Sequence, residues 1–115
     1  MVTVFLSKAL ICFSSVCYPA LVGDETKVGT YDLIPRMVLA EGYGGNVIQY
    51  SQNERVVLAI HRVWEGNPSE RRRERLLSDD ASDRIGVTNG CINVSEEVYD
   101  LIYDCCSNGK LIIKE

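Results

Sequence analysis

The sequence predicts a mainly β fold with minor α: a mostly antiparallel β-sandwich or open barrel with one packed helix and one surface helix. Short runs of β-branched and aromatic residues alternate with polar or glycine-containing turns through most of residues 1–60. Near the C-terminus, apolar residues instead recur at helical spacing. A chain of 115 residues with 46% hydrophobic content and nine glycines suits one small core. We therefore expect a single domain over residues 1–115.

The N-terminal 22 residues are apolar enough to be compared with a secretory signal. Lys8 interrupts the apolar run, whereas a signal peptide carries its positive charge before an unbroken apolar region. Residues up to Phe5, and those over 10–13 and 16–22, are rich in β-branched and aromatic types. We therefore expect strands separated by turns here, rather than a signal.

The middle of the chain is predicted to carry strands that end at the only histidine. A strand-like stretch covers residues 31–40, and three glycines around Tyr43 mark a loop after it. Beyond residues 47–50 and a polar turn, the apolar run 56–60 leads into His61. His61 is therefore expected at the end of a buried strand, where packing fixes a side chain.

A charged insertion, residues 65–83, is predicted to form a short surface helix. Asn67 has the cap position, Pro68 suits the first helical position, and Glu70 has the capping-box spacing. A solvated helix face is the simplest interpretation of the four arginines, and the alternative is that one or two bind carboxylates of a peptide substrate. Arg84, beyond the helix and nearer the cysteine motif described below, is the better single candidate for that binding. The arginines of the insertion are Arg71, Arg72, Arg73 and Arg75.

The C-terminal part is predicted to form a second helix followed by a strand. Ser95 is placed to cap the helix, and two glutamates occupy its favourable first turn. A stop signal at residues 107–109 precedes a short apolar strand at 111–113. We expect this helix to pack behind the site through one apolar face, which consists of Val98, Leu101, Ile102 and Cys105.

Composition argues against several classes of function. A formal net charge of −4 disfavours nucleic acid, which would require a basic face to neutralise phosphates. No run of about eighteen apolar residues occurs, so no transmembrane segment is expected. A zinc site is disfavoured because the chain has no close C-x-x-C pair and only one histidine. We predict no metal and no cofactor.

The five cysteines leave at least one thiol unpaired. Cys12 and Cys17 flank a polar turn and are placed to face each other. Cys105 and Cys106 are sequence neighbours whose side chains point different ways, so we expect no bridge between them. Buried apolar thiols are the simplest interpretation of the cysteines, and Cys91 is the one expected to stay free.

The segment Thr88-Asn89-Gly90-Cys91-Ile92-Asn93 places a cysteine directly after a glycine and downstream of His61. A thiol is only slightly ionised at neutral pH, so acyl transfer needs an imidazole to take its proton. Gly90 permits a sharp turn and a close substrate carbonyl, with main-chain N–H groups available to an oxyanion. The pattern indicates Cys91 as nucleophile and His61 as its base.

These residues resemble the signature of the L,D-transpeptidase catalytic domain: a histidine, a spacer, then Ser/Thr-His-Gly-Cys, an apolar residue, and Asn or Arg. The matching residues are Thr88, Gly90, Cys91, Ile92 and Asn93. Upstream, Gly23 and residues 26–31 resemble the family's Thr-Pro-x-Gly-x-Tyr segment, which leads into strands bordering the active site. The likeness spans almost the whole chain. It departs at Lys27, where proline is usual, at Asn89, where a second histidine is usual, and in a longer spacer.

The resemblance implies an L,D-transpeptidase-like fold and a transferase of peptidoglycan biosynthesis and cell wall biogenesis. Cys91 would attack the carbonyl of the third residue of a donor tetrapeptide and expel D-alanine, with His61 as base. An amine on a second stem peptide or a wall-linked protein would resolve the thioester, whereas water would make the enzyme a hydrolase, an L,D-carboxypeptidase. Backbone N–H groups of Asn89 and Gly90 are candidates for the oxyanion. Candidate substrate-binding residues are Tyr43, Arg84, Thr88 and Asn93.

The implied partners are peptidoglycan stem peptides and carbapenem-type inhibitors, whose strained lactam acylates family members at the cysteine. The implied role is in cell shape, in a periplasmic or otherwise extracytoplasmic place, with the export signal absent from this chain. Two other functions stay open. Lys27 and Asn89 are compatible with a catalytically inactive peptidoglycan-binding relative, and Cys105 and Cys106 with Cys91 are compatible with a redox or regulatory thiol protein.

Overall fold

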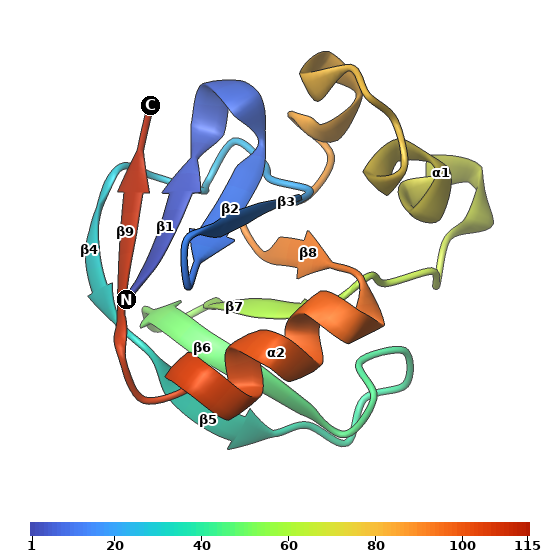
Figure 1. Cartoon of the computed structure of the whole chain (residues 1–115). Helices are drawn as coiled ribbons and strands as arrows, with labels where there is room; N and C mark the ends of the chain where they lie inside the picture. Colours follow the sequence, from blue (N-terminus) through green and yellow to red (C-terminus); the bar gives the residue numbers. More distant parts are fainter.

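The structure, a computed structural model, describes residues 1–115 as two β-sheets with two α-helices. The strands are β1 (Val2–Phe5), β2 (Leu10–Phe13), β3 (Val16–Pro19), β4 (Gly29–Asp32), β5 (Ile34–Met37), β6 (Asn46–Gln52), β7 (Val57–Arg62), β8 (Ile92–Val94) and β9 (Lys110–Lys114). The helices are α1 (Arg72–Leu76) and α2 (Glu96–Cys106). One sheet has the order β3-β2-β1-β9-β4 and the other β5-β6-β7-β8 (Figure 1). The predicted mainly β architecture with one packed and one surface helix is confirmed.

The N-terminal strands form consecutive antiparallel hairpins, as predicted for this region. In the turn between β2 and β3, Ser14 and Ser15 have φ angles of 51° and 66°. Two left-handed residues in a two-residue turn match the right-handed twist of the flanking strands. The resulting register places Cys12 opposite Cys17, and the two form a disulfide.

Strand β9 joins the two ends of the chain in one sheet. It runs parallel to β1 and antiparallel to β4, so the predicted final strand is confirmed. The predicted strand over residues 31–40 is divided instead, because its first part belongs to β4 and the next part to β5 in the other sheet.

The second sheet carries the candidate base. Strands β5, β6 and β7 form an antiparallel meander, and β8 pairs in parallel with β7, with His61 opposite Asn93. Ile60 and Ile92 are fully buried in the main core, so alternation places His61 and Asn93 on the opposite face of the sheet. His61 lies one residue before the end of β7 and is 2% exposed, which confirms its predicted location.

Helix α2 begins as predicted, because the Ser95 hydroxyl accepts the main-chain N–H three residues on, at 3.2 Å. Its buried residues are Val98, Tyr99 and Ile102. Leu101 and Cys105, predicted on this face, are exposed. Tyr99 takes the inward position because its hydroxyl donates to the Asn46 side-chain oxygen at 2.7 Å, which satisfies the polar end of the ring.

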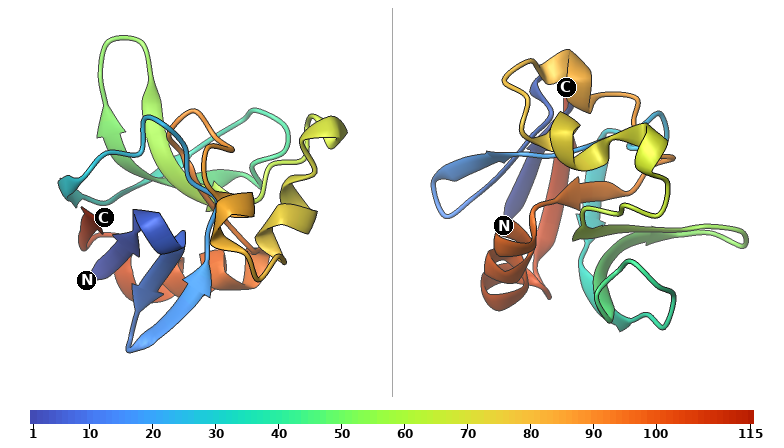
Figure 2. Two further views of the ribbon diagram at one scale, coloured as in Figure 1. Left: turned by 90° about the horizontal axis from the view of Figure 1, so that it is seen from above. Right: turned by 90° about the vertical axis from the view of Figure 1, so that its right-hand side faces the viewer.

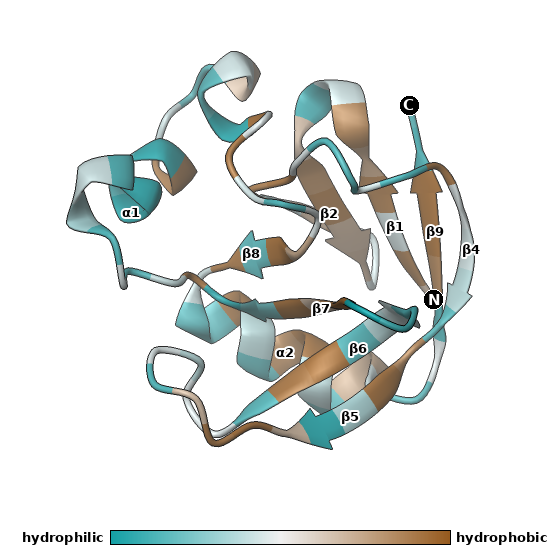
Figure 3. Ribbon diagram, turned by 180° about the vertical axis from the view of Figure 1, so that it is seen from behind, coloured by the Kyte–Doolittle hydropathy of each residue, from teal (hydrophilic) through white to brown (hydrophobic).

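The main core is a cluster of 18 buried residues drawn from both sheets and α2. Figure 3 shows hydrophobic stretches along β1, β2, β9 and β7 and a hydrophilic surface on α1. A smaller cluster of Leu21, Val63 and Leu76 lies under the insertion. The insertion is therefore anchored to the molecule by Leu76 rather than lying free on the surface.

The insertion between β7 and β8 contains three short helical pieces: a 3-10 turn at Pro68–Glu70, α1, and a second 3-10 turn at Ala81–Arg84. Figure 2 shows them gathered on the side of the molecule next to β8. The Asn67 side chain caps the first turn as predicted, accepting the Ser69 N–H at 3.2 Å. The prediction of one helix is wrong in its continuity, because Arg71 adopts a left-handed φ of 54° and interrupts it.

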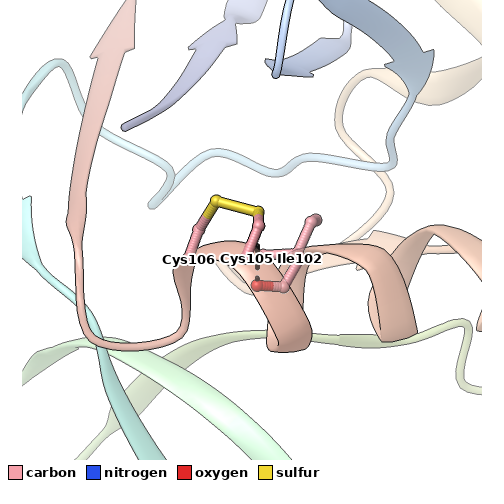
Figure 4. The surroundings of a disulfide bond; sticks show 3 residues. All are labelled: Ile102, Cys105 and Cys106. Carbon is pink, nitrogen blue, oxygen red and sulfur yellow. Dashed lines mark hydrogen bonds between the residues drawn. A yellow bond between two sulfur atoms is a disulfide. The ribbon is translucent and has the colours of Figure 1, made fainter.

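Cys105 and Cys106 form a disulfide at the end of α2 (Figure 4), which corrects the expectation of no bridge. The sequence argument considered only the usual divergence of neighbouring side chains, whereas here both thiols turn toward each other over one peptide bond. None of the cysteines is fully buried, so the interpretation as core thiols is also wrong. Cys91 is the free cysteine, as expected. Neither α-helix has the length and apolar character needed to cross a bilayer.

Candidate active site

Two segments far apart in the sequence meet at the loop before Cys91. Gly23 forms a β-bridge with Thr88, and the Thr26 hydroxyl donates to the Gly90 carbonyl at 2.9 Å while accepting the Gly23 N–H at 3.0 Å. A Cβ atom on Gly23 would lie 1.8 Å from the Thr88 carbonyl oxygen, so only glycine permits this approach. The two motif-like segments singled out in the sequence thus form one structural unit.

Gly90 is held from a second direction by the Tyr50 hydroxyl, which donates to the same carbonyl at 2.6 Å. Gly90 has a φ of 148°, and an added Cβ would lie 2.8 Å from Leu58 and 2.9 Å from Glu25. Burial raises the pKa of Tyr50, so the phenol remains a donor. The backbone immediately before Cys91 is therefore fixed, and position 90 accommodates only glycine.

Thr88 shapes the same turn from within. Its hydroxyl donates to the Cys91 carbonyl at 2.6 Å and accepts the Gly90 N–H at 3.1 Å, and the residue is 7% exposed. The hydroxyl is engaged on both sides and so has a structural role in the turn, and the predicted contact of Thr88 with substrate stays a prediction. The Gly90 N–H, one of the two groups predicted to hold an oxyanion, is also engaged here, which leaves Asn89 as the remaining candidate of the pair.

Cys91 is half-buried, and its thiol lies against the backbone of the neighbouring strand. The Sγ atom lies 3.9 Å from the Val57 carbonyl oxygen on the neighbouring strand. Burial raises the pKa of the Cys91 thiol, against the opposing effects of a backbone hydrogen bond at Ala59 and the charge of Arg72. The resting group is therefore a neutral thiol near neutral pH, and it needs a base to become a nucleophile.

His61 has both ring nitrogens engaged. Nδ1 lies 2.7 Å from the Arg62 carbonyl oxygen, and because a carbonyl only accepts, Nδ1 carries the hydrogen. Nε2 lies 3.4 Å from the side-chain amide nitrogen of Asn93, which only donates, so Nε2 presents its lone pair. The Tyr43 ring packs edge-on against the imidazole with centroids 4.8 Å apart. These contacts define one neutral tautomer.

Burial lowers the pKa of His61 to about 4, the Arg62 carbonyl opposes this shift, and the cationic Arg72 adds to it. The imidazole is therefore neutral over a wide range below neutral pH. In that state Nε2 is available as a base.

The predicted nucleophile directly precedes β8, and the predicted base lies on its neighbour β7. His61 pairs with Asn93, and the alternation of β8, extended by two residues to Cys91, puts that side chain on the His61 side of the sheet. Strand spacing puts the Cα atoms of Cys91 and His61 roughly 8 Å apart. The thiol is turned toward Val57, and no hydrogen bond joins it to the imidazole. Rotation about the Cα–Cβ bond of Cys91 is the motion that would direct the thiol toward Nε2.

No protein-family model and no curated protein matches the sequence, but solved structures match it in shape. An L,D-transpeptidase from Mycobacterium smegmatis gives a TM-score of 0.62 at 16% identity over 99% of this chain and 58% of that one. The chain has an L,D-transpeptidase-like fold. An L,D-transpeptidase in complex with imipenem gives a TM-score of 0.62 at 12% identity, over 97% of this chain and 57% of that one. L,D-transpeptidase 1 of Mycobacterium tuberculosis gives a TM-score of 0.57 at 15% identity, over 99% of this chain and 58% of that one.

The chain thus spans less than two thirds of the length of these solved L,D-transpeptidases. Identities of 12% to 16% establish the likeness of fold alone, because one fold can carry several activities.

Asn93 of this L,D-transpeptidase-like fold is fully buried, and its side chain is engaged on both sides. Its oxygen accepts the Trp64 N–H and an Arg72 Nη1 hydrogen, both at 3.1 Å. Its nitrogen faces His61 Nε2. Asn93, predicted to bind substrate, therefore orients the candidate base instead.

Arg84, predicted to bind a substrate carboxylate, is only 5% exposed. Its guanidinium donates to the carbonyls of Ala9 at 3.2 Å, Lys8 at 2.9 Å and Ser78 at 2.5 Å. These bonds attach the insertion to the first sheet. Because its donors are committed to backbone carbonyls in a buried place, Arg84 has a structural role and not the predicted one.

Tyr43, which packs on His61, belongs to a loop that Arg62 holds in place. Arg62 Nη1 donates to the Tyr43 carbonyl at 3.0 Å, and the Arg62 guanidinium carbon sits 4.1 Å from the centre of the Tyr99 ring. A Cβ on Gly44 would lie 2.7 Å from the same guanidinium, so the loop approaches closely because it is glycine-rich.

Two cavities border this region. One of 670 Å³ lies beside Gly42, Gly44 and Trp64, and one of 560 Å³ lies along Thr88 and Asn89. Neither is lined by Cys91 or His61.

Sequence reasoning missed three residues of the site: Thr26, Tyr50 and Arg72. Thr26 begins the upstream motif-like segment, and Tyr50 ends a predicted strand, so both offered a positional signal. Arg72 offered none, because the capping pattern assigned all the arginines of the insertion to a solvated face. Only the left-handed turn at Arg71 redirects the next side chain toward Asn93.

Proposed function

We propose that this protein is an L,D-transpeptidase that acts on peptidoglycan stem peptides through a thioester on Cys91, with His61 as the base. One observation carries the proposal. The only free cysteine directly precedes β8, and the only histidine lies on β7, the strand that pairs with β8, in an L,D-transpeptidase-like fold. The hydrogen bond from Nδ1 to the Arg62 carbonyl supports it, because it leaves Nε2 as the basic nitrogen.

In the proposed reaction the Cys91 thiol turns from Val57 toward His61. Nε2, released from the Asn93 amide, takes the S–H proton while sulfur attacks the carbonyl carbon of the third residue of a donor tetrapeptide. The main-chain N–H of Asn89 faces the developing oxyanion in this scheme. Nε2–H then protonates the leaving amine, the C–N bond breaks, and D-alanine departs from a thioester on Cys91.

The acceptor completes the cycle. An amine of a second stem peptide, or of a wall-linked protein, attacks the thioester and transfers a proton through His61 back to the sulfur. Water in place of the amine gives L,D-carboxypeptidase activity. Tyr43, packed on the base, is the candidate wall of the donor site.

An extracytoplasmic location fits the same proposal. Its substrate is a cell wall component, and disulfides persist in oxidising compartments. The chain has two disulfides, Cys12–Cys17 and Cys105–Cys106, in addition to the free Cys91.

Intact-mass measurement after incubation with imipenem tests the proposal, since one structure of similar fold is a complex with that compound. We expect one covalent adduct, located on Cys91 by peptide mapping. Cys91→Ser is the matched control and should remain unmodified. A folded wild-type protein that gains no adduct would contradict the proposed activity.

Two observations favour other functions, and the same experiment separates them. The absence of a thiol–imidazole hydrogen bond, together with Asn89, favours an inactive peptidoglycan-binding relative, which would bind stem peptides without an adduct. The Cys105–Cys106 disulfide favours a redox or regulatory thiol protein, which would show reversible thiol oxidation without acylation.

A further inference from the structure

Arg72 differs from the other arginines of the insertion because it points into the molecule. Its side chain is 12% exposed, against 67% for Arg71 and 43% for Arg73. Nε donates to Glu70 at 3.0 Å, Nη1 donates to the Asn93 side-chain oxygen at 3.1 Å, and the guanidinium carbon lies 5.2 Å from the Trp64 ring centre. A chain of contacts therefore runs from Glu70 through Arg72 and Asn93 to His61.

These contacts decide how the Asn93 amide is oriented. Its oxygen receives two donors, the Arg72 guanidinium and the Trp64 N–H. A flipped amide would place its NH₂ group against both donors, which is unfavourable in a fully buried site. The nitrogen of the amide must therefore face His61 Nε2.

The amide in turn decides the state of the imidazole. A donor facing Nε2 favours the tautomer with its hydrogen on Nδ1, the same tautomer that the Arg62 carbonyl requires. A proton on Nε2 would confront the amide N–H groups, so the charged imidazolium is disfavoured as long as the amide cannot turn.

We infer that Arg72 is a positioning residue of this site: by fixing the Asn93 amide it holds the resting His61 in the neutral tautomer that keeps the lone pair on Nε2. Arg72 touches neither Cys91 nor the reacting atoms of a substrate in this scheme. The catalytic meaning of the inference rests on the proposed function. The insertion, which lengthens the spacer between His61 and Cys91, thereby supplies part of the site.

The charge of Arg72 acts in the same sense as its hydrogen bond. It lowers the pKa of His61, after the larger effect of burial, and it opposes the burial that raises the pKa of Cys91. The other groups facing the imidazole are uncharged: the Arg62 carbonyl from β7, the Tyr43 ring from the glycine loop, and the Asn93 amide from β8. Glu70 is the counter-ion of Arg72.

Nitrogen NMR of the imidazole tests the inference without relying on activity, because His61 is the only histidine. The wild type should show the Nδ1–H tautomer. Arg72→Gln should move the half-protonation of His61 to higher pH by at least about half a pH unit, since a nearby cation and a fixed donor are both lost. Arg71→Gln is the matched control and should leave the titration unchanged, because Arg71 pairs with Glu74 at the surface.

Two further variants keep the test decisive. Arg72→Met retains the stem against Trp64 if the glutamine variant does not fold, and the same upward shift is expected. Arg72→Lys retains the charge and should titrate closer to the wild type than Arg72→Met. A wild-type titration in the folded Gln or Met variant, or an equal shift in the Arg71 control, would overturn the inference.

Imipenem acylation separates this inference from the proposed function. Arg72→Gln should shift the lower-pH midpoint of the acylation profile upward by the same half pH unit or more as the imidazole titration. An inert wild type would remove the proposed function, and the imidazole titration would still decide the role of Arg72. A reactive wild type, with equal acylation profiles and equal titrations in Arg72→Gln, would remove Arg72 from the site and leave the function intact.

Discussion

His61 on β7 and Cys91 directly before the neighbouring β8 are held very differently by the protein. The imidazole is 2% exposed and contacts the Arg62 carbonyl, the Asn93 amide and the Tyr43 ring. The Cys91 thiol is half-buried and meets only backbone groups of β7, among them the Val57 carbonyl at a long 3.9 Å.

The backbone at Cys91 is nevertheless fixed by three side-chain hydroxyls, those of Thr26, Tyr50 and Thr88. Conformational freedom at this position is therefore confined to the Cys91 side chain. In the proposed reaction the base is fixed and the nucleophile rotates. The resting and reactive positions of the thiol then differ by one side-chain torsion, which costs little free energy compared with moving a loop.

Removal of the thiol should have the largest effect on this pair. Cys91→Ser is expected to abolish acylation by imipenem while the fold survives, because a hydroxyl is a far weaker nucleophile than a thiol with the same base. Intact mass measures acylation, and circular dichroism checks that the variant is folded. Cys105→Ser serves as a control that should retain acylation, and its loss in a folded protein would favour the redox alternative.

Removal of the base should have the next largest effect. His61→Ala is expected to slow acylation of Cys91 by at least about a hundredfold, the lower end for general-base catalysis. The second-order rate constant with imipenem, measured on variants of confirmed fold, gives this number. A near-normal rate would show that the thiol is activated without the imidazole.

The buried state of His61 predicts an unusual pH dependence. Because its pKa is lowered to about 4, the base stays neutral, and half of the maximal acylation rate should be reached near pH 4. If half of the maximal acylation rate were reached near pH 6.5, which is about the ordinary pKa of histidine, the base would be an exposed one.

Stability should respond to pH through the same group. Between about pH 6.5 and 4 the unfolded chain binds a proton at His61 that the folded protein does not bind. The free energy of unfolding should therefore decrease as pH falls through this window, by up to roughly 3 kcal/mol from this group. Denaturant unfolding of the wild type and of His61→Gln at several pH values gives the free energy of unfolding of each. The variant should lose less of it as the pH falls.

Asn89 should matter least. It lies in the loop beside Cys91 and, as an amide, cannot exchange a proton near neutral pH. If His61 is the sole titrating base, Asn89→His should change the acylation rate only about twofold to threefold and add no titration step. An inert wild type that becomes reactive with histidine at this position would identify the chain as an inactive relative.

Local sequence patterns predicted the parts of this structure that depend on local interactions. The hairpin with facing Cys12 and Cys17 followed from β-branched runs around a polar turn, and the start of α2 followed from the Ser95 cap. The location of His61 followed from the apolar run before it. In each case the residues that decide the conformation are neighbours in the chain.

The failures concern side chains whose partners are distant in the sequence. Arg84 was predicted to bind a substrate carboxylate, yet it binds carbonyls between β1 and β2. Arg72 was predicted on a solvated helix face, yet it binds Asn93. Thr88 and Asn93 fitted a family motif, but the motif did not reveal that their polar atoms are used inside the protein. Burial and partner choice are properties of the assembled fold.

Trapping of the acyl-enzyme with a donor stem tetrapeptide tests the pairing of a fixed base with a mobile thiol most directly. Rapid quenching and mass spectrometry should show a tripeptide thioester on Cys91, with one D-alanine released for each adduct, in the wild type. His61→Ala should accumulate the adduct about a hundredfold more slowly. A folded wild type that forms no thioester and releases no D-alanine would contradict the assignment of Cys91 and His61 as a catalytic pair.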